Sequence, residues 1–115
     1  MVRRKDERTI DVKQMFGGAG LARLEHIRNG AEELYGKGRV FSHLVLEPGC
    51  EVGYHVHHGD GEVYYILKGE GEYSDNGTLV TVYPGDVTFT DDGEGHSLTN
   101  KGTENLEAIA LVLYK

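Results

Sequence analysis

The sequence predicts a single all-β domain of antiparallel strands, and three features of it support this class. Glycine is abundant, with 17 residues, and both prolines stand directly before a glycine, at 48–49 and 84–85. Pro-Gly dipeptides mark tight turns. Between the turns the chain runs in short stretches rich in valine, leucine, isoleucine, tyrosine and threonine, with almost no helical segment. Many short strands at regular spacing favour a small sandwich or barrel.

Eight of these stretches are expected to be strands, because each is short, β-branched or aromatic, and bounded by turn residues. In chain order they are residues 39–47, 51–57, 62–69, 69–74, 78–83, 86–90, 96–100 and 106–114. Residues 8–15 and 20–27 are also strand-like. We expect residues 1–20 to form a partly flexible N-terminal arm and residues 21–115 to form the β domain.

Local signals define the turns between these strands. Asn76-Gly77 is typical of a two-residue hairpin, and residues 67–73, "LKGEGEY", suggest a second tight reversal. Residues 29–38 can form one helical turn, which their glycines keep short.

Composition and charge exclude several classes of function. The net charge of -7 argues against nucleic-acid binding, which needs clustered lysine and arginine. The basic residues near the N-terminus are interrupted by acidic ones, which is typical of a solvated arm. No apolar run approaches the ~20 residues that span a bilayer, and no apolar signal-peptide core is present. With Cys50 as the single cysteine, we expect a cytoplasmic protein.

Residues 55–62, "HVHHGDGE", carry half of the six histidines of the chain. Side chains alternate along a strand, so His55 and His57 point the same way, ~7 Å apart. Glu62 opens the next strand, and His96 opens another strand after a glycine-rich turn. Three imidazoles and one carboxylate can bind a divalent ion and leave two positions open in octahedral geometry. Mn²⁺, Fe²⁺, Ni²⁺, Cu²⁺ and Zn²⁺ all suit this set.

The other histidines have simpler interpretations. His58 has the opposite parity to His57 and stands beside a glycine, so we expect a loop residue. His26 and His43 have no partner at ligand spacing and are interpreted as hydrogen-bonded structural residues. His43 lines the interior only if its strand parity points inward.

The same residues resemble the two motifs of the cupin family. From Gly49 the chain reads glycine, five residues, His-x-His, four residues, Glu62, six residues and Gly69. From Gly85, "GDVTFTDDGEGHSLTN" resembles the second motif, with Gly93, His96 and Asn100 at the expected spacing. One position departs from the pattern: Asp91 stands where the family has proline, and it is expected, with Asp92, near the mouth of the metal site.

The resemblance implies a double-stranded β-helix, or jelly-roll, barrel that pairs into a homodimer. It also implies that His55, His57, Glu62 and His96 are the metal ligands. Decarboxylases, dioxygenases and isomerases are among the activities found in the family. The strand-like residues 8–15 and 20–27 could add to the sheet edge of a second copy.

Strand parity also suggests which residues surround the metal. Continuing from Glu62, Tyr64 and Ile66 share its face, which makes Tyr64 the best candidate for contact with a bound molecule and a possible catalytic residue. An aromatic core residue is an equally good interpretation of Tyr64. Val87 and Phe89 are expected in the core, and Asn100 is expected to bond to backbone groups.

Two functions remain open at this point. In the first, an enzyme uses the metal to polarise a small anionic or chelating substrate. No Ser-His-Asp or Cys-His nucleophile is evident, so any chemistry should centre on the metal. In the second, a non-catalytic module captures a small metabolite or the metal itself. Turnover distinguishes the two.

Overall fold

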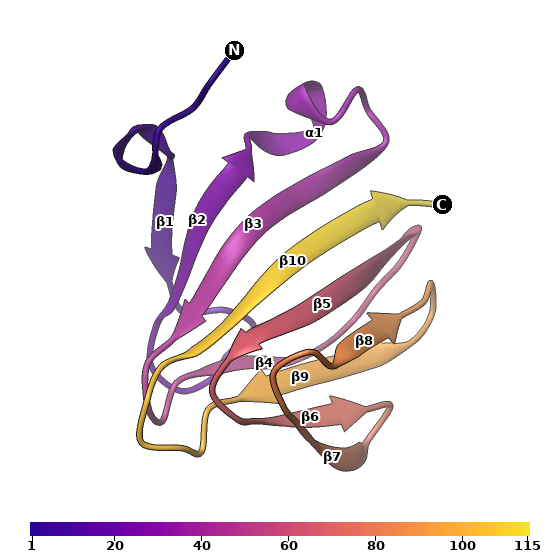
Figure 1. Ribbon diagram of the computed structural model, residues 1–115. Coiled ribbons are helices and arrows are strands. Elements are labelled where there is room, and N and C mark those ends of the chain that lie inside the picture. Colours follow the sequence, from indigo (N-terminus) through magenta and orange to yellow (C-terminus); the bar gives the residue numbers. More distant parts are fainter.

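The computed structural model describes residues 1–115 (Figure 1). A 3-10 helix, Lys5–Glu7, precedes the first strand, and the only α-helix is the single turn α1. The elements are β1 (Ile10–Lys13), β2 (Ala22–Arg28), α1 (Gly30–Glu33), β3 (Gly38–Leu46), β4 (Glu51–Val56), β5 (Asp60–Lys68), β6 (Gly71–Asp75), β7 (Thr78–Val82), β8 (Val87–Thr90), β9 (Gly95–Thr99) and β10 (Leu106–Tyr114).

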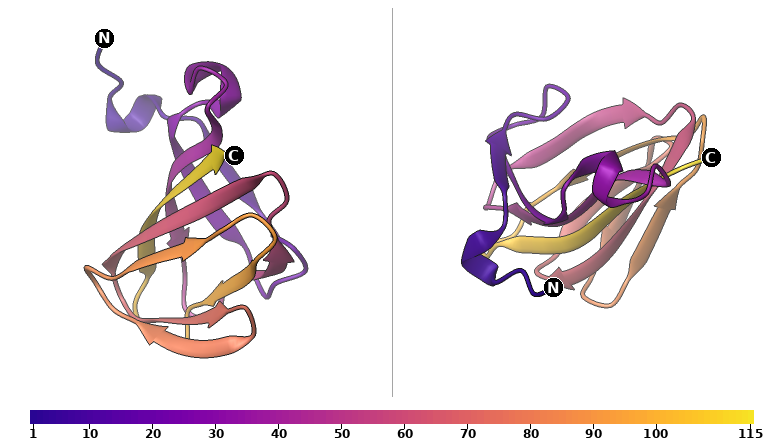
Figure 2. Two further views of the ribbon diagram at one scale, coloured as in Figure 1. Left: turned by 90° about the vertical axis from the view of Figure 1, so that its right-hand side faces the viewer. Right: turned by 90° about the horizontal axis from the view of Figure 1, so that it is seen from above.

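The strands form two antiparallel sheets that face each other, as Figure 2 shows from two further directions. One sheet has the order β1-β2-β3-β10-β5-β8, and the other has the order β4-β9-β6-β7. Several neighbouring strands, such as β3 and β10 in one sheet and β4 and β9 in the other, come from distant parts of the chain, as in a jelly roll. This confirms the predicted class, but the two sheets do not close into a continuous barrel.

A hydrophobic core fills the space between the sheets. The inward-facing residues alternate along each strand, as Leu44 and Leu46 do on β3 and Ala108 and Ala110 do on β10. Leu98 of β9 and Ile66 of β5 belong to opposite sheets, and both are fully buried in this core. The core adjoins the polar residues described below, because Tyr64 and Tyr73 belong to it and their rings pack against His96.

The Asn-Gly hairpin is confirmed between β6 and β7. Asn76 and Gly77 both have positive φ, at 52° and 95°, and the strands pair from Asp75↔Thr78 to Gly71↔Val82. The reversal predicted at residues 67–73 is wrong as a hairpin, because β5 and β6 belong to different sheets. That segment instead carries the chain from one sheet to the other, and Gly69, with φ 81°, forms its corner.

The burial of β8 differs from the prediction. Val87 and Phe89 were expected in the core but are 65% and 57% exposed, whereas Thr88 and Thr90 are buried. The alternation of the strand is as expected, but the inner face carries threonine because Thr90 bonds to a buried tyrosine, Tyr73, beside the histidine cluster. A polar interior at this end reverses the usual rule that the apolar residues face inward.

The N-terminal residues lie along the edge of the larger sheet. Ile10–Lys13 pairs with Ala22–Glu25, and Arg3 makes a paired hydrogen bond with the carboxylate of Glu33. The division at residue 20 between a flexible arm and the domain stays a prediction. No helix in the structure has the length and apolar character needed to cross a membrane.

Candidate metal centre

Three strands place the four predicted ligands at one end of the space between the sheets. His55 on β4 lies directly opposite His96 on β9 in the antiparallel register. His57 follows the end of β4, where its backbone N–H donates to the carbonyl of Glu94. Glu62 is the third residue of β5 and points inward, in alternation with its half-buried neighbours Gly61 and Val63. The predicted shared face of His55, His57 and Glu62 is therefore present.

The donor atoms of these four residues converge. Nε2 of His96 lies 3.1 Å from Nε2 of His55 and 3.1 Å from Nε2 of His57. Oε1 of Glu62 lies 3.1 Å from His96 Nε2 and 3.3 Å from His57 Nε2. All four donor atoms lie within 4.8 Å of one another.

These separations fit a divalent transition metal. Two ligand atoms at right angles around an ion with bonds of about 2.1 Å lie about 3.0 Å apart. Three imidazole lone pairs and a carboxylate aimed at one buried point also repel one another unless a cation or protons lie between them. The donor set, three imidazole nitrogens and one oxygen, suits the metals from Mn²⁺ to Zn²⁺.

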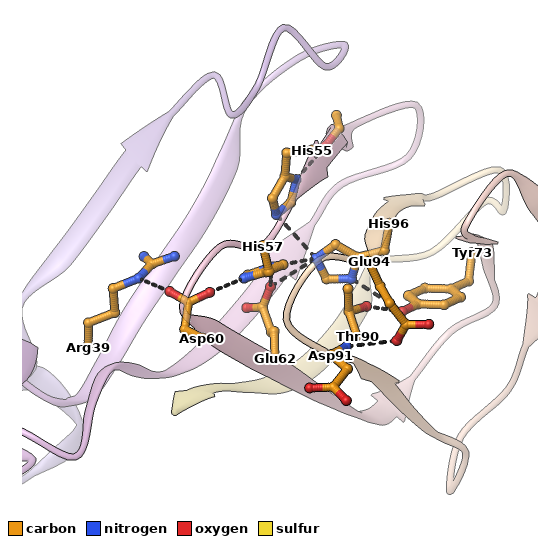
Figure 3. A network of polar contacts seen from close by, with 11 residues as sticks. Arg39, His55, His57, Asp60, Glu62, Tyr73, Thr90, Asp91, Glu94 and His96 are labelled. Atoms are coloured by element: carbon orange, nitrogen blue, oxygen red, sulfur yellow. Dashed lines mark hydrogen bonds and ion pairs between the residues drawn. The ribbon is translucent and has the colours of Figure 1, made fainter. Parts of the chain in front are cut away.

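Outer hydrogen bonds hold the imidazoles in the orientation that a metal needs (Figure 3). Nδ1 of His57 lies 2.6 Å from Oδ1 of Asp60, whose other oxygen accepts a hydrogen bond of 2.8 Å from Nε of Arg39. Asp60 is buried, and it fixes the His57 proton on Nδ1 and leaves Nε2 as the ligand atom. Arg39, Asp60 and His57 thus form a line that ends at the cluster.

The other two histidines are oriented by different groups. Nδ1 of His55 donates to the backbone carbonyl of Gly53 at 2.8 Å. Nδ1 of His96 lies 3.3 Å from the hydroxyl of Tyr73, which in turn lies 2.6 Å from Oγ1 of Thr90. Each of these three histidines therefore has a partner for Nδ1 and presents Nε2 to the common point.

The electrostatics of the metal-free cluster follow from these contacts. Hydrogen bonding to Glu62 raises the pKa of His57 above 6.5, against the effect of its burial. Burial lowers the pKa of the His55 imidazole. Burial of Glu62 opposes its ionisation, but hydrogen bonds from His57 and His96 outweigh burial and lower its pKa. The cluster thus favours an ionised carboxylate that is paired with imidazole.

A small cavity opens beside the cluster. Its volume is about 50 Å³, enough for a ligand of a few non-hydrogen atoms. His55, His57, Glu62, Tyr64 and Arg39 contribute its polar groups, and the rest of the lining is apolar: Met15, Phe16, Leu24, Val40, Leu44, Val52, Ala110 and Val112. The cavity can therefore hold a small molecule against the cluster in largely apolar surroundings.

Tyr64 lies where strand parity placed it. Its ring stacks on His96, with ring centroids 5.2 Å apart and planes at 15°, and it lines the cavity. Burial, and then the charge of Glu62, raise the pKa of Tyr64 well above 10. Tyr64 thus keeps a neutral hydroxyl and packs its ring on a candidate ligand, His96, which combines both interpretations offered by the sequence.

The remaining histidines are where they were expected. His58 is exposed, and its side chain does not belong to the cluster. His26 lies 2.6 Å from Ser42 and 2.7 Å from Asp11, and His43 lies 2.8 Å from Glu107. His43 does not line the interior, because its neighbours in the strand are the buried ones.

Asn100 and the Asp91–Asp92 pair were predicted with different success. Asn100 donates to the carbonyls of Leu46 and Glu104, which confirms its role as a backbone tie. Asp91 accepts a hydrogen bond from the backbone N–H of Asp92, as expected of a turn aspartate. Neither carboxylate lines the cavity, and that of Asp92 accepts a hydrogen bond from the backbone N–H of Gly59, so their place near the metal mouth stays a prediction.

The sequence did not reveal the outer residues Arg39, Asp60 and Tyr73, nor Phe16, whose ring stacks on His55. The position of Asp60 between His57 and Glu62 in the chain was a signal that its carboxylate lies near the cluster. Arg39 and Phe16 carried none, because only the folding of distant strands brings them to the cluster.

Comparison with known proteins agrees with this geometry. The family model described as "Cupin domain" matches residues 42–113. The oxalate-binding protein of Thermotoga maritima is 43% identical over 114 residues, which cover 98% of this chain and 93% of that protein.

Solved structures agree as well. A crystal structure described as a predicted oxalate decarboxylase from Thermotoga maritima superposes with a TM-score of 0.93 and 42% identity, over 100% of both chains. A putative sugar phosphate isomerase from Acidithiobacillus ferrooxidans shares the fold, with a TM-score of 0.80, 22% identity, and coverage of 99% of this chain and 75% of that one. The motif match, the jelly-roll topology and the cluster of three histidines and one glutamate lead to one conclusion: this chain belongs to the cupin family.

Proposed function

We propose that this protein binds a small dicarboxylate of the oxalate type through a divalent metal held by His55, His57, Glu62 and His96. The observation that carries the proposal is the convergence of four donor atoms beside a cavity of about 50 Å³ that three of the four residues line. An octahedral ion with four protein ligands keeps two positions, which suit the two oxygens of a chelating dianion. The metal, when bound, supplies the positive charge that a dicarboxylate chelates.

Arg39 supports an anionic ligand. It is the only cationic side chain in the lining, and its hydrogen bond to Asp60 uses Nε. Both Nη nitrogens therefore keep donors for a carboxylate. The relative of 43% identity is named for binding oxalate, which agrees with this ligand class.

Binding is favoured over turnover by the groups that the cavity provides. Decarboxylation of oxalate to formate and carbon dioxide consumes one proton, which an acid in the cavity must supply. Glu62 is the only carboxyl group in the lining, and it is a proposed metal ligand. Tyr64, with its pKa well above 10, is a poor acid.

Metal-dependent decarboxylation is the second candidate. A structure of 42% identity is described as a predicted oxalate decarboxylase, which favours it. Dioxygenase and isomerase activities, which also occur in the cupin family, stay open. Each would be recognised as consumption of the ligand by the metal-loaded protein.

One experiment separates these candidates. Protein purified without chelators or a histidine tag is analysed for its metal, and the loaded protein is titrated with oxalate and, as a control, acetate. We expect one metal per chain and saturable binding of oxalate that acetate does not reproduce. Absence of oxalate binding would overturn the proposal. Release of carbon dioxide or formate would show that the protein is a decarboxylase and not a binding module.

We also propose that the protein is a homodimer. The outer face of the larger sheet carries an apolar patch of Val87 and Phe89 on β8 and Tyr65 on β5, all about half exposed or more. Tyr65 pairs with Val87, so the patch is continuous across the two strands. A patch of this kind is typical of a protein–protein contact.

A cytoplasmic location stays a prediction from the lone cysteine and the composition.

A further inference from the structure

We propose that Phe16, in the loop between β1 and β2, caps the metal cavity and limits it to ligands of about the size of oxalate. The size selection rests on the proposed function, whereas the cap itself requires only that the site holds a metal. Phe16 and Met15 lie outside the residues 42–113 that match the family model, yet both line the cavity. The N-terminal segment therefore supplies part of the wall.

The Phe16 ring covers one of the proposed metal ligands. Its centroid lies 3.7 Å from that of the His55 imidazole, and the two planes are only 11° apart. At the same time Phe16 is 55% exposed. One face of the ring thus lies on the imidazole while the rest meets solvent, as expected of a side chain at the mouth of a cavity.

The backbone of Phe16 is held in an unusual conformation. Its φ is 53°, in the left-handed region that aromatic residues rarely adopt. Such a conformation persists only where the surroundings enforce it. The fixed backbone therefore sets the direction in which the Phe16 side chain leaves the loop, toward His55.

Backbone contacts with β4 enforce this conformation. The carbonyl of Met15 accepts hydrogen bonds of 3.0 Å from the N–H groups of both Gly18 and Gly53. Two further bonds fix the loop: Glu51 N–H donates to the Ala19 carbonyl at 2.8 Å, and Gln14 donates to the Gly18 carbonyl at 3.0 Å.

Two glycines make this close approach possible. A Cβ on Gly53 would lie 2.2 Å from the carbonyl oxygen of Phe16, and a Cβ on Gly18 would lie 2.5 Å from that of Glu51. The carbonyl of Gly53 also accepts the hydrogen bond from His55 Nδ1. The same residue therefore fixes both the cap and the ligand ring beneath it.

The test compares Phe16→Ala with the unmodified protein and with Tyr35→Ala as a matched control. Tyr35 is also aromatic with positive φ, at 56°, but is 85% exposed and does not line the cavity. The manganese-loaded proteins are titrated with oxalate, malonate and succinate by calorimetry. We expect Phe16→Ala to reduce the preference for oxalate over succinate at least tenfold, whereas Tyr35→Ala keeps it.

A second readout does not depend on dicarboxylate binding. Manganese is extracted from the loaded proteins with excess EDTA, a chelator much larger than the cavity. We expect Phe16→Ala to release manganese at least tenfold faster, with an equilibrium manganese affinity changed less than threefold. Phe16→Leu keeps apolar bulk, so its rate of manganese release should lie between those of Phe16→Ala and the unmodified protein. It also provides a folded variant if Phe16→Ala fails to fold.

The outcomes separate the cap from the proposed function. If the unmodified protein binds no dicarboxylate but Phe16→Ala still releases manganese faster, the proposed function fails and the cap stands. If Phe16→Ala matches the unmodified protein in both ligand preference and release rate, the cap is overturned. Faster release that only mirrors a weaker equilibrium affinity would also overturn it, since Phe16 would then act on His55 alone.

Discussion

At the scale of single residues, three neighbouring histidines of the chain show how strand parity separates candidate ligand from bystander. His57 is buried with its Nε2 in the cluster, whereas His58, the next residue, is exposed. His55, two residues before His57, faces the same point. Alternation along β4 and its continuation therefore assigns two of the three histidines to the site.

We predict that alanine at His55 or His57 abolishes stoichiometric metal binding, because each removes one of only four protein donors. Glu62→Gln should weaken binding less completely, since it removes the charge but keeps an oxygen. Metal content is measured on chains with native circular dichroism spectra. His58→Ala is the control and should keep its metal; its loss of metal, with retention in His57→Ala, would show that the parity assignment is wrong.

The Asp60 carboxylate allows a second prediction. Asp60→Asn weakens its hydrogen bonds to both His57 and Arg39, so the His57 ring loses its fixed orientation. We expect metal affinity to fall about 10–100-fold, the usual effect of removing an outer partner of a ligand histidine. Competition with a chromogenic chelator measures the affinity. Asp75→Asn, an exposed aspartate on β6, is the matched control and should be unchanged.

Metal binding should also be linked to protons. The hydrogen bond to Glu62 raises the pKa of His57, so part of the metal-free protein carries a proton there at neutral pH. Metal must displace that proton, and its affinity should decrease as the pH falls through the His57 pKa. Calorimetry at pH 7 in buffers of different ionisation enthalpy should show proton release on metal binding. The absence of any release would contradict the protonation of His57.

At the scale of elements, the contact between the N-terminal residues and α1 predicts a pH dependence. The hydrogen bond from Arg3, and then the backbone N–H of Asn29, lower the pKa of Glu33 to about 2. Because this pKa is below the ordinary value of 4.5, the contact stabilises the arm above pH 4.5 and weakens as the pH falls toward about 2.

Removing the Glu33 charge at pH 7 should have the same effect as acid. Glu33→Gln should release the arm, whose basic residues Arg3, Arg4, Lys5 and Arg8 are trypsin sites. We expect faster cleavage there by limited trypsin digestion, read by mass spectrometry. Glu32→Gln is the control, since that neighbouring side chain is exposed and has no partner for its carboxylate in the structure. Equal cleavage rates in both variants would contradict the prediction.

At the scale of the whole molecule, the proposed dimer makes the apolar patch on β8 and β5 a contact surface. We predict that Phe89→Glu yields a monomer, because a charge in the centre of an apolar contact is costly to desolvate. Light scattering at micromolar concentration measures the mass. Leu79→Glu is the matched control, because Leu79 is similarly exposed, at 63%, but lies on the other sheet. A monomeric unmodified protein would contradict the dimer itself.

The sequence by itself determined the strands, the Asn76-Gly77 turn and the four candidate ligands. These depend on local rules, namely alternation along a strand, the φ of turn residues and the spacing of histidines near a carboxylate. The resemblance to the cupin motifs added the sheet arrangement, which local rules do not specify. The assignment of Val87 and Phe89 to the core was wrong because local rules do not say which face of β8 is inside.

Only the tertiary structure decided what surrounds the ligands. Arg39, on β3, contacts Asp60 although 21 residues separate them in the chain. Phe16, in the loop between β1 and β2, contacts His55 on β4. Tyr73 meets His96 across 23 residues of chain. Side chains so far apart are brought together by the pairing and stacking of sheets, and the physical reason is that no periodicity within one strand carries information about the strand packed against it.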